Sequence, residues 1–168
     1  MKKNKAVFLD RDGTINYDFG YVYEKDKLKF LPGVISSLKR LSEAGYLLII
    51  ITNQSGIGRR YFTLDEYNEF NNYMLKQLKD KGVNITKVYY CPHTDLDGCN
   101  CRKPKLGLFY QAIDEYNIDL DKSFAIGDNE RDLAICMNSP ICGILLNKDS
   151  KKFVSKKDFK DATDFILS

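Results

Sequence analysis

Short apolar runs alternate along the chain with segments whose apolar residues recur at helical spacing. Runs such as "KAVFLD" and "YLLIIIT" are continuously apolar, as buried strands of a parallel sheet are. Pro32 and Thr63 begin two of the helical segments, and each segment stops at a glycine, Gly45 and Gly82. The pattern predicts strands over residues 5–10, 46–52, 87–91, 123–128 and 141–146, and helices over 32–45, 63–82, 106–116, 130–138 and 159–166.

Strands that alternate with helices favour one architecture, a doubly wound, mostly parallel, Rossmann-like α/β sheet. In such sheets ligands bind at the carboxyl ends of the strands. Four predicted strands end there in polar residues: Asp10, Thr52 with Asn53, Cys91, and Asp128. We therefore expect these side chains to meet at one edge of the sheet and to form the functional site.

The composition indicates one ordinary globular domain over residues 1–168, with 43% hydrophobic and 29% charged residues. The longest apolar stretch, residues 46–51, is too short to span a bilayer, and "MKKNK" is followed by too short an apolar run for a signal peptide. The net charge of +3 is too small to indicate a nucleic-acid partner. We expect a cytoplasmic monomer that acts on a small molecule, without nucleic-acid or membrane partners.

Two carboxylates stand two residues apart in "DRDGT", directly after the first strand. An isolated D-x-D-G is more often a simple turn. Here a further acidic cluster, "GDNERD", follows another strand. Asp10, Asp12 and Asp128 together predict a Mg²⁺ site, because this ion prefers oxygen ligands and offsets the repulsion between like charges.

A carboxylate beside such a cation can act as a nucleophile towards phosphorus. We assign this role to Asp10, which would form an aspartyl-phosphate. Asp12 would protonate the leaving oxygen and then deprotonate the water that hydrolyses the intermediate. The remaining candidates would stabilise the transferring phosphoryl group by hydrogen bonds and positive charge; they are Thr52, Asn53, Arg102 and Lys103.

Three of the five cysteines lie close together with the one histidine of the chain, in the pattern C-x-H-x5-C-x-C. Three thiolates and an imidazole suit tetrahedral Zn²⁺, and four protein ligands make a closed, structural site. The ligands would be Cys91, His93, Cys99 and Cys101, which define a zinc loop over residues 91–101. Because Arg102 and Lys103 follow directly, the ion would position both cations. Cys136 and Cys142 are interpreted as small core residues.

Four ordered motifs, "DRDGT", "ITNQSG", "RKP" and "GDNERD", resemble the signature motifs of the haloacid dehalogenase superfamily of phosphatases. The resemblance covers residues 6 to 145, and no stretch is long enough for a separate cap domain. It implies a capless Mg²⁺-dependent phosphatase. The zinc loop is similar to those of two groups within the superfamily, the heptose 1,7-bisphosphate phosphatases and the histidinol-phosphate phosphatases.

The segment "INYDFGYVYEKDKLKFLPGV" resembles the heptose group more closely. That resemblance implies removal of the 7-phosphate of D-glycero-D-manno-heptose 1,7-bisphosphate, in the synthesis of activated heptose for surface polysaccharide. Asn129 takes a position where heptose phosphatases often carry lysine. The implied substrate-binding residues are Asp18, Phe19, Gly20, Tyr21, Thr52, Asn53, Gln54, Ser55, Arg102, Lys103 and Asn129.

Two alternatives remain open. The first is a histidinol-phosphate phosphatase, since the short spacer between His93 and Cys99 also occurs in that group. The second belongs to another class, a zinc-stabilised binding module without catalysis. A degenerate enzyme would have lost at least one of Asp10, Asp12, Lys103 or Asp128, and all four are present.

Overall fold

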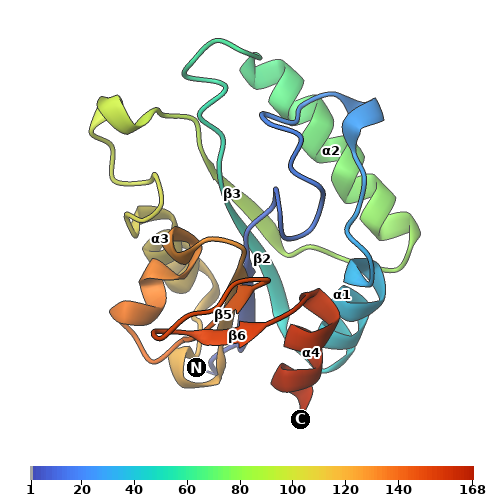
Figure 1. Ribbon diagram of the computed structural model, residues 1–168, viewed down its shortest axis with the longest axis vertical. Helices are drawn as coiled ribbons and strands as arrows, with labels where there is room; N and C mark the ends of the chain where they lie inside the picture. The colour runs from blue at the N-terminus through green and yellow to red at the C-terminus, as the bar shows by residue number, and fades with distance from the viewer. Residues whose placement is uncertain (1) are drawn as a thin grey trace.

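Six parallel strands form one sheet at the centre of the computed structural model, which describes residues 2–168 (Figure 1). The strand order is β3-β2-β1-β4-β5-β6, so the expected doubly wound α/β sheet is confirmed. The strands are β1 (Ala6–Leu9), β2 (Leu47–Asn53), β3 (Lys87–Cys91), β4 (Phe124–Gly127), β5 (Cys142–Leu146) and β6 (Val154–Lys156).

The chain order reverses beside β1, which pairs with β2 on one side and with β4 on the other. Leu9, the last residue of β1, is in register with Ile50 of β2 and with Ile126 of β4. Clefts open at such switch points, because the loops leave the two neighbouring strands in opposite directions. The loops after β1, β2 and β3 all lie at the upper end of the view in Figure 1.

Helices cover both faces of the sheet (Figure 1). Helices α1, α2 and α4 pack with Val7 and Leu9 on one face, whereas α3 and the 3-10 helix η4 pack with Ala6 and Phe8 on the other. This alternation along β1 is why the strand is apolar at every position. The helices are α1 (Val34–Glu43), α2 (Leu64–Asp80), α3 (Gly107–Tyr116) and α4 (Phe159–Leu167), with 3-10 helices η1 (Lys25–Lys27), η2 (Asp95–Asp97), η3 (Leu120–Lys122) and η4 (Glu130–Met137).

Thr63, where the sequence predicts the start of a helix, forms a capping box at the start of α2. The Thr63 hydroxyl accepts a hydrogen bond from the Glu66 backbone N–H at 3.1 Å, and the Glu66 carboxylate accepts one from the Thr63 N–H at 2.9 Å. Four apolar side chains of α2, from Tyr67 to Leu78, then lie buried on one face.

In the part of the chain described, no helix combines the length and apolarity that crossing a membrane requires.

Two elements differ from the sequence prediction. The segment expected as a short helix at 130–138 is the 3-10 helix η4, whose tighter turns eclipse side chains three residues apart. Strand β6 was not predicted. It has three residues, lies in the lysine-rich segment 148–160, and pairs with β5 at the edge of the sheet. Short, charged edge strands carry little apolar signal.

Candidate active site

The turn after β1 brings two strand ends together. The Asp10 N–H donates to the Ile126 carbonyl of β4 at 3.2 Å, and the chain then turns back so that the Gly13 N–H donates to the Asn16 carbonyl at 2.8 Å. Gly13 has φ +88°, and a Cβ at this position would collide with the Asp128 carboxylate. Glycine is therefore required here for both its conformation and its small size. The contact sets Asp10 and Asp128 side by side at the switch point.

Asp12 is held by four hydrogen-bond donors. Arg11 places Nε 3.1 Å from Oδ1 and Nη2 2.8 Å from Oδ2. Asn16 Nδ2 and Gln54 Nε2 donate to the same two oxygens at 2.9 and 3.1 Å. Arg11 itself is fully buried, stacks 4.8 Å from the centre of the Phe70 ring, and also donates to a backbone carbonyl. This bidentate pair fixes the orientation of the Asp12 carboxylate.

Lys103 links two carboxylates deep in the site. Its buried ammonium lies 2.9 Å from Asp10 Oδ1 and 2.8 Å from Asp132 Oδ1, and it also donates to the Ile51 carbonyl. Asn53 holds the lysine backbone by two hydrogen bonds, at 2.9 and 3.1 Å. The predicted meeting of strand-end residues is present, because Asp10 follows β1 and Asn53 ends β2.

Three carboxylates lie within 4.8 Å of one another: Asp10, Asp128 and Asp132. Burial and the neighbouring Asp132 raise the pKa of Asp10 well above its ordinary value, against the lowering effect of Lys103. The same two causes raise the pKa of Asp128. Excess negative charge in a buried group is what a hard divalent cation offsets, so the donor set fits Mg²⁺.

The observed acidic group differs in one member from the expected one. Asp132 takes part in it, whereas the carboxylate of Asp12 lies outside it and is bound by its four donors. Sequence reasoning missed Asp132 although "GDNERD" contains it. The available signal was its place four residues after Asp128 at the start of an apolar helix, where a buried carboxylate needs a cation such as Lys103.

Asn129 caps η4 instead of facing the cleft. Its side-chain oxygen accepts from the Arg131 N–H at 3.1 Å, and its own N–H donates to the Asp132 carboxylate at 3.2 Å.

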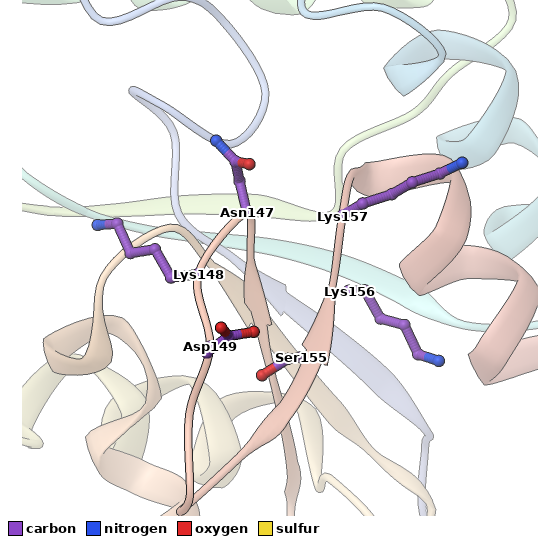
Figure 2. A pocket seen from close by; sticks show the side chains of 6 residues that line it. All are labelled: Asn147, Lys148, Asp149, Ser155, Lys156 and Lys157. Atoms are coloured by element: carbon purple, nitrogen blue, oxygen red, sulfur yellow. The ribbon is translucent and has the colours of Figure 1, made fainter.

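A residue beyond the motifs supports the same loop: the Lys148 ammonium donates to the Asp128 carbonyl. Figure 2 shows Lys148 pointing away from Lys156 and Lys157, so the three amines around this side pocket do not converge on one point.

The four predicted zinc ligands also come together. Atoms of Cys91, His93, Cys99 and Cys101 lie within 4.8 Å of one another. The sulfurs of Cys91 and Cys99 are 3.7 Å apart, close to the roughly 3.8 Å between two thiolates on a tetrahedral zinc ion. Cys91 ends β3, and the other ligands lie in the loop that leads to Lys103. The sulfurs of Cys91 and Cys101 are closer, at 2.9 Å. The donor set of three thiols and one imidazole fits Zn²⁺.

A cleft of about 310 Å³ opens above these groups. Of the expected substrate-binding residues, Phe19 and Asn129 are absent from its lining, and Phe19 stacks on Tyr17 with 57% of its surface exposed. Sequence reasoning missed Arg131, which does line it. The full lining is Asp10, Asp12, Asp18, Gly20, Tyr21, Thr52, Asn53, Gln54, Ser55, Arg102, Lys103, Arg131 and Asp132.

Comparisons with known proteins agree on a phosphatase. A family model described as "Polynucleotide kinase 3 phosphatase" matches residues 5–166. A D-glycero-beta-D-manno-heptose-1,7-bisphosphate 7-phosphatase of Pasteurella multocida is 43% identical over 97% of this chain and 91% of its own. The corresponding alpha-heptose enzyme of Campylobacter jejuni is 40% identical over 98% and 96%.

A comparison with solved structures finds the same kind of enzyme. A crystal structure of D,D-heptose 1,7-bisphosphate phosphatase from B. bronchiseptica, complexed with magnesium and phosphate, superposes with a TM-score of 0.89 and 28% identity, over 97% of this chain and 98% of that one. This agrees with the enzyme class, a phosphomonoesterase, that the motifs implied. The chain therefore belongs to the haloacid dehalogenase-like phosphatase family that includes the D-glycero-D-manno-heptose-1,7-bisphosphate 7-phosphatases.

Proposed function

We propose that this enzyme hydrolyses the 7-phosphate of D-glycero-D-manno-heptose 1,7-bisphosphate and leaves heptose 1-phosphate. The observation that carries the chemistry is the largely buried Asp10, which faces the cleft with one oxygen bound by Lys103. The substrate rests on the relatives that match nearly the whole chain. The same relatives do not favour the histidinol-phosphate alternative. The resemblance of the sequence motifs implies a role in the synthesis of activated heptose.

In this mechanism an Asp10 oxygen attacks phosphorus, and the bond between phosphorus and the C7 oxygen breaks. Asp12 donates a proton to that oxygen as it leaves, and the donors around Asp12 keep its carboxyl group aimed at the cleft. A water molecule then attacks the aspartyl-phosphate, Asp12 accepts its proton, and orthophosphate departs. Thr52, Asn53 and Lys103 stabilise the charge on the transferring group.

Asp10 and Asp128 would hold the magnesium ion together with Asp12, the third ligand that the motifs predict; Asp132 lies within 4.8 Å of Asp10 and Asp128 but is paired with Lys103. When bound, the ion neutralises charge on the phosphoryl oxygens. The cysteine and histidine cluster would hold a structural zinc ion that fixes the loop carrying Arg102 and Lys103. We further expect a monomer in a reducing compartment such as the cytoplasm, where five unpaired thiols persist.

Side-by-side kinetics test the substrate. The enzyme should turn over α- or β-heptose 1,7-bisphosphate with a kcat/KM at least roughly 100-fold above those for histidinol phosphate and for a 3′-phosphorylated oligonucleotide. Equal or higher activity on either of the last two would overturn the assignment. Asp10→Asn serves as the control, because any phosphate release that survives this change comes from another site or a contaminant. Phosphate release by the unchanged protein that is lost in Asp10→Asn would also exclude the non-catalytic alternative.

A further inference from the structure

Two aromatic pairs join the loop that follows β1 to the loop that follows β2. Tyr23 stacks on Phe62, with ring centroids 5.0 Å apart and an interplanar angle of 17°. Tyr21 meets Tyr61 edge to face, with centroids 4.8 Å apart and an angle of 79°. Phe62 is buried, whereas Tyr21 and Tyr61 are 48% and 56% exposed. The first pair therefore fastens the two loops together, and the second extends their contact to the surface.

Two unusual backbone conformations meet at the exposed pair. Tyr21 has φ +52°, and Arg60, directly before Tyr61, has φ +62°. The other non-glycine residues with positive φ among residues 2–168 are Asn117 and Asn147, and asparagine adopts this region readily. A bulky side chain does so rarely, and such strain persists only where the surrounding structure fixes it. The strain in both loops therefore coincides with the contact between these two rings.

Tyr21 gives the cleft a surface that its other residues lack. Among the described residues that line the cleft, Tyr21 carries the one aromatic side chain, and all the others except Gly20 are polar or charged. Polar and charged groups suit the phosphate and hydroxyl groups of a ligand, whereas an aromatic ring suits its carbon skeleton. Tyr61 does not line the cleft. It can therefore act on a ligand only through the ring of Tyr21.

The protein holds Tyr61 in place from behind. Its N–H donates to the Gly56 carbonyl at 2.8 Å, and the Arg59 N–H donates to the Ser55 carbonyl at 2.9 Å in the same loop. The ring of the neighbouring Phe62 lies so close to Gly56 that a Cβ there would collide with it. This tight loop presents the Tyr61 ring at a fixed position, against which the more exposed loop of Tyr21 can rest.

We propose that Tyr61 is a positioning residue, which holds the ring of Tyr21 over the cleft so that this ring covers the carbon skeleton of a bound sugar phosphate. The sugar phosphate as ligand rests on the proposed function. Because Asp10 and Asp12 are held by other donors, the contact between the two rings contributes to the binding of the substrate and not to the chemical step.

The kinetic test compares Tyr61→Ala, Tyr61→Phe and Tyr110→Ala with the wild type. Tyr110 is the matched control, because it is 55% exposed and lies on α3 outside the cleft lining. In Tyr61→Ala we expect KM for heptose 1,7-bisphosphate to rise roughly fivefold with little change in kcat, since one aromatic contact is lost. Tyr61→Phe should restore KM, because the contact joins the rings. Tyr110→Ala should match the wild type.

Orthophosphate distinguishes a positioning role from general damage to the site. This inhibitor has no carbon skeleton, so its inhibition constant should be the same in Tyr61→Ala and in the wild type. Inhibition by heptose 1-phosphate, which keeps the carbon skeleton, should weaken in Tyr61→Ala in parallel with the rise in KM. Thermal melting shows whether each variant is folded.

A second readout needs no substrate. The chain contains no tryptophan, so Tyr21→Trp introduces a single fluorescent reporter at the ring that is to be held. When Tyr61→Ala is added to this variant, acrylamide should quench the tryptophan more strongly, because the ring loses the neighbour that restrains it. Adding Tyr110→Ala instead should leave the quenching unchanged.

An unchanged KM in Tyr61→Ala, a Tyr61→Phe variant as impaired as Tyr61→Ala, or equal quenching with and without the Tyr61 ring would overturn the positioning role. A weaker inhibition by orthophosphate in Tyr61→Ala would overturn it too, because the phosphate site itself would then be damaged. The proposed function fails in a different way, when the wild type shows no preference for heptose 1,7-bisphosphate over other phosphate esters. The quenching comparison still tests Tyr61 in that case.

Discussion

Arg11 is the residue on which the geometry of Asp12 depends. It is fully buried, its charge is balanced by one partly exposed carboxylate, and its guanidinium makes the paired contact that orients this group. Removing one partner of a buried pair leaves an uncompensated charge. We therefore expect the Arg11 side chain to contribute both to the stability of the fold and to the orientation of Asp12.

We expect Arg11→Met to lower the free energy of unfolding by about 3 kcal/mol or more, because Asp12 loses its buried partner. Arg40→Met is the matched control, since Arg40 pairs with Asp164 on the surface, where both side chains are more than 40% exposed, and such pairs contribute about 0–1 kcal/mol. Urea unfolding of both variants measures the difference. Equal midpoints in the two variants would contradict the structural role given to Arg11.

The residues of the site were predictable where they stand at strand ends. Asp10, Asn53 and Cys91 follow or end apolar runs, and parallel strands bring such positions together whatever the loops do. Asp132 and Arg131 lie in the first turn of the 3-10 helix η4, where the direction of a side chain depends on the cap formed by Asn129. These directions follow from the path of the backbone, which a single sequence does not reveal.

At the scale of elements, the loop from β3 to α3 has little core of its own. Atoms of its three cysteines and one histidine lie within 4.8 Å of one another, and Lys103 follows two residues after the last of them. A metal ion there would replace the missing apolar packing. The order of this loop and the placement of both cations would then depend on the same ion.

Protein purified without added metal should contain about one zinc per chain, as a closed four-ligand site implies. Cys101→Ser should lose most of it, bind zinc at least roughly 10-fold more weakly, and become sensitive to proteases within residues 91–103. Cys136→Ser removes a thiol that packs against the core outside the cluster, and it should keep the metal. Equal zinc content in both variants would rule out the assigned ligand set.

Strand β5 supports the acidic group through the residue two positions beyond its end. Lys148 reaches the Asp128 carbonyl and so restrains the loop that presents the Asp128 carboxylate. We expect Lys148→Met to raise the half-saturating Mg²⁺ concentration roughly fivefold, because one charge-assisted hydrogen bond is lost. Lys151→Met should have no such effect. The Mg²⁺-induced rise in melting temperature gives a readout independent of activity, and identical titrations for both variants would contradict this role.

The elements themselves were largely predictable from periodicity. Strands β1 to β5 and helices α1 to α4 were all predicted, since each buries a continuous run or a single stripe. Strand β6 was not, because three residues at the sheet edge bury too little apolar surface to leave a pattern. The 3-10 geometry of η4 was also unpredictable, since its apolar residues satisfy an α-helical spacing equally well.

The molecule as a whole is organised around one sheet with two apolar layers, and both layers meet on β1. No second sheet or cap is present in residues 2–168, so the cleft is closed only by the loops above the strand ends. The single domain that the length predicts stays a prediction, which unfolding measurements test.

Because the two layers share their strands, we expect the metal-loaded protein to unfold in one cooperative transition. Far-ultraviolet circular dichroism and tyrosine fluorescence should give the same midpoint in urea, since tyrosines such as Tyr46 and Tyr89 belong to opposite layers. Two separated transitions would indicate that the layers, or the metal loop, form independent units.

The central claim is that Asp10 captures phosphorus at the carboxyl edge of this sheet. A crystal structure with Mg²⁺ and beryllium trifluoride, which mimics an acyl-phosphate, tests it most directly. The account predicts beryllium bonded to a carboxylate oxygen of Asp10, with the Lys103 ammonium beside it. Beryllium bonded to Asp12, Asp128 or any other side chain would contradict it.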